Sequence, residues 1–179
     1  MYYFLTLGAM LLLMTPCAAD NSDLVDFNDK TIGTWLTVLD YPYCKWMFSS
    51  GAVPNSNVGP NGPLDGEGSY AYVLMDNSTT CIAAALYRKE LNFTSNMTLS
   101  FNYYVVFDEN VYLGVEAFSA TTHLAAWNWQ QTSISSQWDS LHINIAADND
   151  IAITIVALRT NLNATALIAI DNIKLEPQM

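Results

Sequence analysis

Positive charge is scarce in this sequence. Among its 179 residues only 6 are lysine or arginine, against 17 aspartates and glutamates, and the formal net charge is −11. The few basic residues form no cluster or run. A chain of this charge repels phosphate backbones and anionic lipids, so we expect neither nucleic acid nor a charged membrane surface as a partner.

Long apolar runs are scarce beyond the start of the chain. Residues 1–19 carry no charge, hold an apolar run over 7–14 and end in a helix-breaking proline and two small alanines. This pattern is typical of a secretory signal peptide cleaved near Ala19, although the usual basic start is missing. The alternative, a membrane anchor, normally needs a longer run. We therefore expect a signal peptide over 1–19 and a single secreted domain over 20–179, with no membrane insertion of the mature chain.

Cysteine is also rare. Cys17 would be lost with the signal peptide, which leaves Cys44 and Cys81. In an oxidising compartment an even pair predicts one disulfide, which would stabilise the domain by about 4 kcal/mol in the chain-entropy model. Two buried free thiols are the alternative.

Four Asn-x-Ser/Thr triplets suit the same compartment. Each is an acceptor for N-glycosylation and would then have to face solvent. They begin at Asn77, Asn92, Asn96 and Asn163.

Motifs of catalysis are missing from the sequence. There are two histidines, His123 and His142, and no serine stands in a Gly-x-Ser-x-Gly elbow. The zinc motif His-Glu-x-x-His does not occur. Glu116 and Asp139 could be offered as the carboxylate pair of a glycosidase, but nothing in their spacing singles them out. We expect no enzyme.

The abundant feature is the pattern of β-strands. Apolar and polar residues alternate in Leu99-Ser-Phe-Asn-Tyr and in Leu141-His-Ile-Asn-Ile, which places His142 on the solvent side. Turn residues occupy 108–110 and 148–150, and residues 51–68, rich in Gly, Pro, Asn and Ser, predict an extended loop. The sequence therefore predicts an all-β sandwich or jelly roll of two antiparallel sheets. The predicted strands are 24–28, 34–39, 44–49, 69–75, 81–91, 97–107, 111–119, 123–130, 138–146, 151–158 and 166–175.

One segment is more distinctive than the rest. From Trp46 to Val73 the chain holds a Ser-Gly-x-x-Pro turn, a Gly-Pro pair and a glycine-rich approach to Tyr-x-Tyr-Val. Two further segments are distinctive. They are Asp-Phe-Asn at 26–28 and the closing segment 168–175, which reads Ile-Ala-Ile-Asp-Asn-Ile-Lys-Leu. Together they resemble the MAM domain, the extracellular module of meprins, neuropilins and certain receptor tyrosine phosphatases. Trp35, the Leu-x-Phe-x-Tyr strand from Leu99 and Trp138 agree in order, so the match spans nearly the whole mature chain.

The resemblance implies a jelly-roll sandwich of the concanavalin-like or galactose-binding-like kind, with Trp35, Trp46 and Trp138 in the core. This sequence departs from the family pattern in two places. The family usually has four cysteines in two bridges, and its opening Glu is replaced here by Asn28.

The resemblance also implies one structural calcium or sodium ion, held by the opening strand, the glycine-rich loop and the closing strand. The candidate ligands are Asp26, Asn28, Asp65 and Asp171, whose oxygens suit calcium, although Asn28 brings no charge. The alternative is that Asp171 only bonds the backbone near the opening strand.

We therefore predict a secreted, non-catalytic adhesion or interaction module that binds an extracellular protein. The alternative is a carbohydrate-binding, lectin-like module. Trp127 and Trp129 lie two apart on a predicted strand and share a face, where they could stack on sugar rings if exposed or pack in the core if buried. A homo-oligomer, formed through a free edge strand, is a further expectation.

Overall fold

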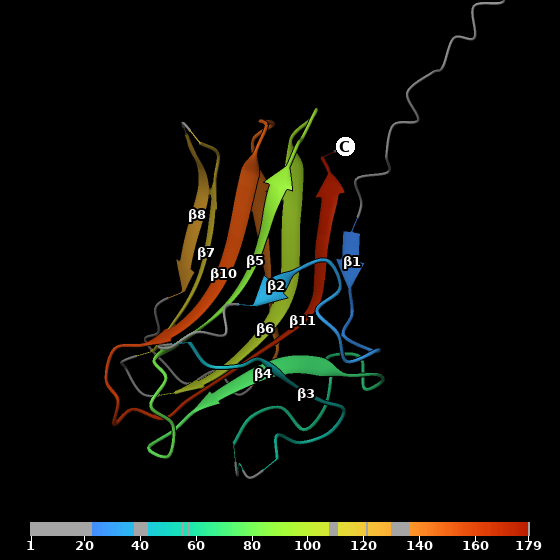
Figure 1. The fold of residues 1–179 in the computed structure, drawn as a ribbon. Coiled ribbons are helices and arrows are strands. Elements are labelled where there is room, and N and C mark those ends of the chain that lie inside the picture. The colour runs from blue at the N-terminus through green and yellow to red at the C-terminus, as the bar shows by residue number, and fades with distance from the viewer. Residues whose placement is uncertain are drawn as a thin grey trace, which may run out of the picture.

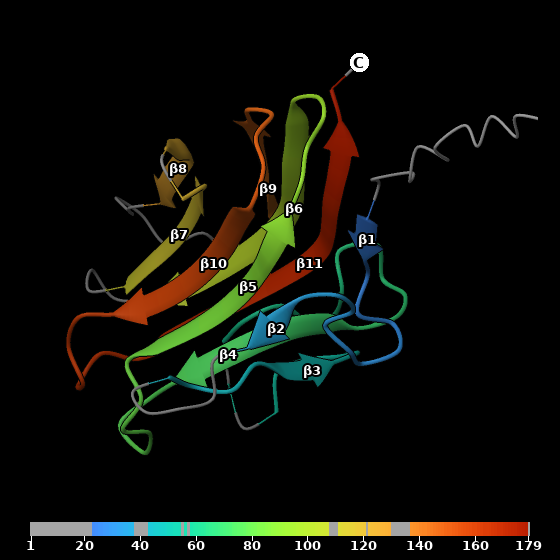
Figure 2. The same cartoon turned by 45° about the horizontal axis from the view of Figure 1, so that its top comes forward.

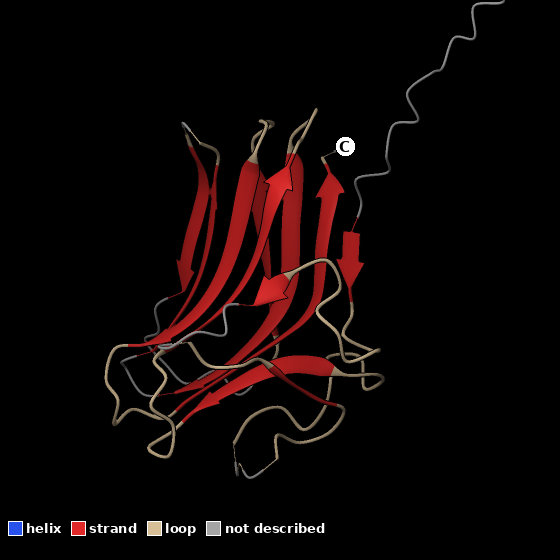
Figure 3. Ribbon diagram, viewed as in Figure 1, coloured by secondary structure: helices blue, strands red, loops and turns tan. Residues whose placement is uncertain are grey.

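The computed structural model describes residues 23–37, 43–54, 56, 58–107, 111–120, 122–129 and 137–178, without the side chains of 107 and 126–129. Every regular element of this part is a β-strand (Figure 3). The predicted signal peptide and the turn at 108–110 lie outside the described residues. Among the described residues there is no helix of the length and hydropathy that a membrane crossing requires.

The strands form two antiparallel sheets that face each other (Figures 1 and 2), which confirms the predicted jelly-roll sandwich. The first sheet has the order β3 (Met47–Ser49), β4 (Tyr70–Met75), β11 (Ala166–Pro177), β6 (Met97–Phe107) and β9 (Asp139–Ile145), with β1 (Asp23–Val25) beside β11. The second sheet has the order β2 (Leu36–Thr37), β5 (Ala83–Leu91), β10 (Ile151–Arg159), β7 (Val111–Phe118) and β8 (His123–Trp129).

The main core fills the space between the sheets. Strand β10 shows why these residues form it: Ile151, Ile153 and Ile155 are fully buried, while the residues between them are only partly covered. Each buried isoleucine contributes about 1.5–3 kcal/mol of apolar burial. The period of two in the sequence is therefore the direct cause of the inward row.

The first sheet is also covered on its outer face. There the loop 51–68 packs over a second cluster, made by Val53, Tyr70, Tyr72, Leu167 and Ala169 among others. Strand β11 is consequently buried on both sides over residues 166–171. This explains the nearly continuous apolar run Ala-Leu-Ile-Ala-Ile, because a strand covered on both faces has no solvent side to keep polar.

Two expectations need correction. The predicted strand over 24–28 ends at Val25, because Phe27 turns the chain with a φ of 57° while its side chain remains buried. Trp35 and Trp46 are core residues, as expected. Trp138 is not: it is half-buried and packs on the outer cluster, because the loop 51–68 provides a second apolar surface there.

Candidate functional site

The loop 51–68 is fastened to the outer face of the first sheet at several points. The hydroxyl of Tyr70 donates to the backbone oxygen of Gly51 at 2.7 Å, and the indole Nε1 of Trp138 donates to that of Gly62 at 3.3 Å. Pro60 and Pro63 of the loop are buried. These bonds attach described residues of the loop to the side chains of the first sheet and of Trp138.

Trp138 is the centre of an aromatic cluster under this loop. Its ring meets Tyr70 and Tyr104 edge to face, with centroids 5.7 and 5.8 Å apart. Edge-to-face pairs of this kind contribute about 0.5–1.5 kcal/mol beyond their area burial. The cluster explains why the loop keeps its position although it lacks regular structure.

The far end of the loop meets the opening segment and the closing strand. Asp171 of β11 is 2% exposed, and its Oδ2 accepts a hydrogen bond from the backbone N–H of Leu64 at 3.2 Å. Its Oδ1 accepts from the backbone N–H of Asn172 at 2.8 Å. Asp171 therefore bonds backbone of the glycine-rich loop and of its own strand, whereas the alternative prediction placed its backbone partner near the opening strand.

Asn28 links the opening segment to the glycine-rich approach. Its Nδ2 donates to Asp26 Oδ2 at 2.9 Å, and its Oδ1 accepts from the backbone N–H of Ser69 at 3.0 Å. A Cβ on Gly68 would lie 1.6 Å from that same Oδ1, and Gly68 has a φ of 79°. Only glycine lets the backbone come this close to the amide.

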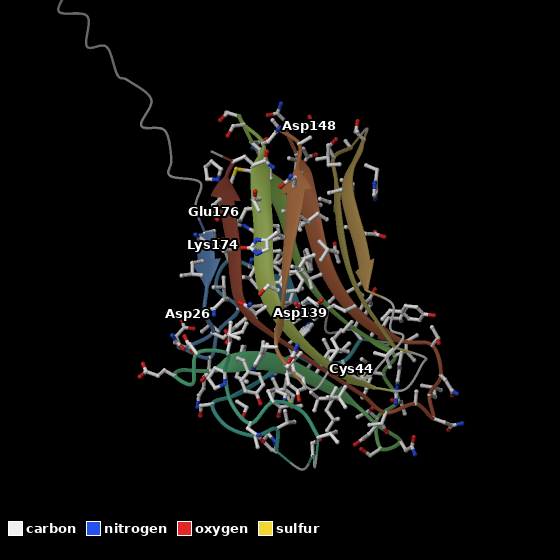
Figure 4. The ribbon with its side chains drawn as sticks, turned by 180° about the vertical axis from the view of Figure 1, so that it is seen from behind. Asp26, Cys44, Asp139, Asp148, Lys174 and Glu176 are labelled. Atoms are coloured by element: carbon white, nitrogen blue, oxygen red, sulfur yellow. A yellow bond between two sulfur atoms is a disulfide. The ribbon has the colours of Figure 1, made fainter. Side chains whose placement is uncertain are left out.

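The carboxylates at this end act on one another. The pKa of Asp171 is raised to about 6, chiefly by burial. The bonds from Leu64 and Asn172 lower it, and the negative charges of Asp65 and Asp26 raise it. Asp171 itself lies in the middle of β11, between the residues that pair with β4 and those that pair with β1. Figure 4 shows Asp26 just beyond the lower end of β1.

A family comparison identifies this arrangement. The family model described as MAM domain, meprin/A5/mu matches residues 25–179. The chain belongs to the MAM domain family. MAM domains are extracellular, adhesion-type modules without catalytic activity of their own.

Solved structures share the fold of this MAM domain at low identity. The K1 cleaved adhesin domain of Lys-gingipain from Porphyromonas gingivalis W83 superposes with a TM-score of 0.58 at 14% identity, over 88% of this chain and 99% of that one. The Stig cyclase Fisc from Fischerella sp. TAU gives 0.52 at 16% identity, over 92% and 93%. A CBM4 structure gives 0.50 at 10% identity, over 85% and 99%. At such identities the likeness shows the fold alone. No curated protein matches this chain.

The cysteine pair of this MAM domain forms one disulfide, as predicted. Cys44 and Cys81 are bonded, with their Cα atoms 5.2 Å apart. The bond ties the segment before β3 to the start of β5, where the backbone N–H of Cys44 also donates to the oxygen of Ala83. It therefore joins the two sheets at one end of the sandwich.

A buried cation beside this disulfide was not predicted. Arg159, the last residue of β10, is 0% exposed and donates to the backbone oxygens of Cys81, Asp76 and Ala164 at 3.1, 2.9 and 3.0 Å. Two more bonds go to Thr79. All five N–H donors of a guanidinium are thereby used. The alternation of buried and partly buried residues along β10 could have indicated this residue. It continues one residue past the predicted end of the strand at Leu158 and makes position 159 a buried one.

The predicted ion ligands have the atom types that bind a metal ion, but they are not spaced as a metal site. Carboxylate and amide oxygens are the ligands of calcium, and the mutual repulsion around Asp171 is what a cation would relieve. In the described part of the chain, however, no three His, Cys, Asp or Glu side chains are close enough to form a metal site. Asp65 is exposed, and its Oδ1 accepts from the backbone N–H of Glu67 at 3.2 Å. Ion binding would require Asp65 to turn toward Asp171.

Trp127 and Trp129 lie on β8, the edge strand of the second sheet, and their side chains are outside the described part. Their backbone positions pair with Val115 and Leu113. Both of these partners belong to the buried row between the sheets. Since the side chains themselves lie outside the described part, both alternatives for the tryptophan pair, exposed for sugar stacking or packed in the core, stay predictions.

All four sequon asparagines are exposed. The Oδ1 atoms of Asn92 and Asn96 accept from the backbone N–H groups of Asp150 and Ala147, so each Nδ2 is left for a glycan. Asn92 and Asn96 stand in the β5–β6 turn, Asn77 in the β4–β5 turn and Asn163 in the β10–β11 turn. Glycosylation remains a prediction, and it would occupy the two ends of the sandwich (Figure 1) and leave the sheet faces clear.

The titratable residues considered for catalysis are not brought together. Glu116 is exposed on the second sheet, whereas Asp139 begins β9 of the first sheet. Asp139 Oδ2 accepts from the hydroxyl of Tyr103 at 3.0 Å, and burial together with this bond raises the pKa of Tyr103 to about 12. His123 and His142 are exposed on different sheets.

Proposed function

We propose that this MAM domain is a secreted, non-catalytic interaction module that binds an extracellular protein through its loop 51–68. The observation that carries the proposal is a set of exposed apolar side chains on and beside a fastened loop. They are Val58, 48% exposed, Leu64, 42% exposed, and Met47 of the neighbouring β3, 40% exposed.

The fastening is what makes these side chains useful for recognition. Ordering a mobile loop on binding costs about 0.5–1.5 kcal/mol for each immobilised side chain. The bonds to Tyr70, Trp138 and Asp171 already hold this loop, so that cost is largely absent. Val58 and Leu64 can then act as anchors that lose water on contact.

The charge of the loop indicates the kind of partner. Residues 51–68 contain Asp65 and Glu67 and no lysine or arginine. With a net charge of −11 for the chain, a partner with a basic rim around an apolar centre would be steered toward this end.

The test uses the oxidised, secreted protein as bait on living cells, with proximity labelling of surface proteins. The double variant Val58→Glu, Leu64→Glu should lose the labelled partner while its thermal midpoint stays unchanged. The matched control is Leu162→Glu, which alters an exposed leucine in the β10–β11 turn and should keep the partner. Equal labelling by all three proteins, or no specific partner for the wild type, would refute the proposal.

We also propose that one calcium ion supports this loop from the side of Asp26, Asn28, Asp65 and Asp171. Extracellular calcium modules bind with Kd values of about 10⁻⁴–10⁻³ M, so about 10 mM calcium should raise stability by roughly 1.4–2.7 kcal/mol. Asp65→Asn should abolish this increase, whereas Asp150→Asn, at an exposed site between β9 and β10, should not. No calcium-dependent shift in thermal midpoint would exclude the ion, and sodium would be distinguished by repeating the titration in sodium-free buffer.

A further inference from the structure

Two cavities lie on the outer face of β6 and β9, on the side shown in Figure 4. The larger, of about 320 Å³, is lined by residues 59–63 together with Tyr104, Gln137 and Trp138. The smaller, of about 110 Å³, is lined mainly by Ser100, Asn102, Ser140, His142 and Asn172. Neither cavity was anticipated from the sequence.

The two cavities are consecutive along one surface. Asn102 pairs with Ser140 and Ser100 pairs with His142, so these four side chains share the outer face. Tyr104 follows Asn102 on that face of β6, and its ring contacts Trp138 just before β9. We call this surface, made by Ser100, Asn102, Tyr104, Trp138, Ser140 and His142, the β6–β9 strip. From Ser100 to Tyr104 it extends about 14 Å at the rise of a strand.

Unused hydrogen-bonding groups are concentrated in its polar half. Asn102 Nδ2 donates to Ser140 Oγ at 2.7 Å, which leaves the Asn102 carbonyl and one more N–H. The side chains of Ser100, His142 and Asn172 line the same cavity, and none forms a hydrogen bond with the rest of the described chain. Hydroxyl, carboxamide and neutral imidazole groups can each donate and accept. Their ligand should therefore carry groups that do both.

Formal charge is missing from the lining. Neither cavity is lined by aspartate, glutamate, lysine or arginine of the described residues. At the rim, Lys174 and Glu176 neutralise each other in an ion pair of 2.5 Å (Figure 4). An anionic ligand would be repelled by the net charge of −11, and a cationic ligand would find no carboxylate in either cavity.

We propose that the β6–β9 strip binds a neutral oligosaccharide. Its hydroxyl groups would meet Ser100, Asn102, His142 and Asn172, and the apolar face of one sugar ring would lie against Trp138 and the prolines of 59–63. The strip is too long for one ring and suits a short chain. This site is distinct from the Trp127 and Trp129 pair, and it goes beyond the protein-binding role of the exposed loop residues.

A peptide is the less suitable occupant. An extended peptide adds to the edge of a sheet through backbone groups, here the outer edge of β9, whereas the strip is a face that offers side chains. A helical peptide needs an apolar groove, and half of this surface is carboxamide, hydroxyl and imidazole. Peptide binding is therefore an outcome that the experiment must detect.

The test is isothermal titration of the oxidised chain with a panel of neutral oligosaccharides of glucose, mannose, galactose, xylose and N-acetylglucosamine. At least one sugar should bind saturably and change the tryptophan fluorescence. Asn102→Ala and His142→Ala, which alter partly or fully exposed side chains, should each weaken binding about tenfold. Thr154→Ala, on the outer face of the second sheet, is the matched control and should bind like the wild type.

Three results would overturn the proposal. They are no binding by any sugar of the panel at about 10 mM, binding equal in the wild type and both cavity variants, and competition by a proline-rich peptide that binds more tightly than every sugar. The variant Val58→Glu, Leu64→Glu should keep sugar binding. The sugar site and the proposed protein-binding loop can therefore fail independently of each other.

Discussion

Arg159 donates two hydrogen bonds from Nη2 to Thr79, at 2.6 Å to the backbone oxygen and 3.2 Å to Oγ1. The same Oγ1 accepts from the backbone N–H of Asp76 at 3.1 Å and donates to the Asp76 oxygen at 2.9 Å. The turn that leads from β4 to the disulfide is therefore organised around a buried guanidinium. Apolar packing could not do this, because the turn offers mostly backbone oxygens.

Replacing Arg159 by Met should lower the free energy of unfolding by about 3 kcal/mol or more, because several buried carbonyl groups lose their donor. Arg159→Lys should lose less, since an ammonium has three donors in place of five. Urea unfolding of the oxidised proteins measures both. Lys89→Met, at an exposed position of β5, should change stability by less than about 0.5 kcal/mol. An unchanged urea midpoint for Arg159→Met would contradict this account.

The Cys44–Cys81 bond should contribute about 2–5 kcal/mol of stability. Reductant should lower the thermal midpoint of the wild type toward that of the double variant Cys44→Ala, Cys81→Ala. The double variant serves as the control, because reductant should leave its own midpoint unchanged. If reductant lowers both midpoints equally, the effect does not come from this disulfide.

Substitutions at Gly68 and Gly66 should distinguish the cost of a steric clash from the cost of backbone strain. Both have positive φ angles, 79° and 81°, but a Cβ on Gly66 would meet nothing within 4 Å, whereas one on Gly68 would collide with Asn28. Gly66→Ala should cost about 1–2 kcal/mol from the backbone alone. Gly68→Ala should cost clearly more, and Asn28→Ala in the same chain should restore part of the loss. Chemical denaturation of the four proteins tests this, and equal costs for the two glycines would disprove the close approach.

The sequence predicts most of the strands because inward and outward rows alternate along the chain. Strands β6 and β10 begin where the predicted runs begin, and the loop 51–68 lies where its glycines and prolines place it. The disulfide could be predicted because only one pairing is left once Cys17 is assigned to the predicted signal peptide.

The remaining features depend on contacts between distant segments. The role of Arg159 requires Cys81 and Thr79 to lie beside it, and the outer position of Trp138 requires the loop to fold back over the sheet. The β6–β9 strip requires the register that pairs Asn102 with Ser140. No local pattern contains that register, so a single sequence could name the strands but not the surface they form.

Ionisation of the Asp171 carboxyl should make the stability of the protein depend on pH. Its pKa is raised from the ordinary 3.8 to about 6, chiefly by burial. Between these values the folded protein keeps a proton that the unfolded chain has released, so this group makes stability fall as the pH rises from about 4 to 6. Above this window both states are ionised, and below it both are protonated.

Asp171→Asn removes this group, so the stability difference between wild type and variant should itself depend on pH. With calcium chelated, the wild type should have its greatest advantage near pH 4 and its smallest above pH 6, measured by urea unfolding at each pH. Hydrogen bonds donated by Ser78 and Ser119 lower the pKa values of Asp76 and Asp148, so the stabilising effect of these bonds is lost only as the pH falls below about 4. A constant difference from pH 4 to 7 would mean that the Asp171 carboxyl titrates alike in the folded and unfolded chains, and the electrostatic argument for a cation at this end would then lose its basis.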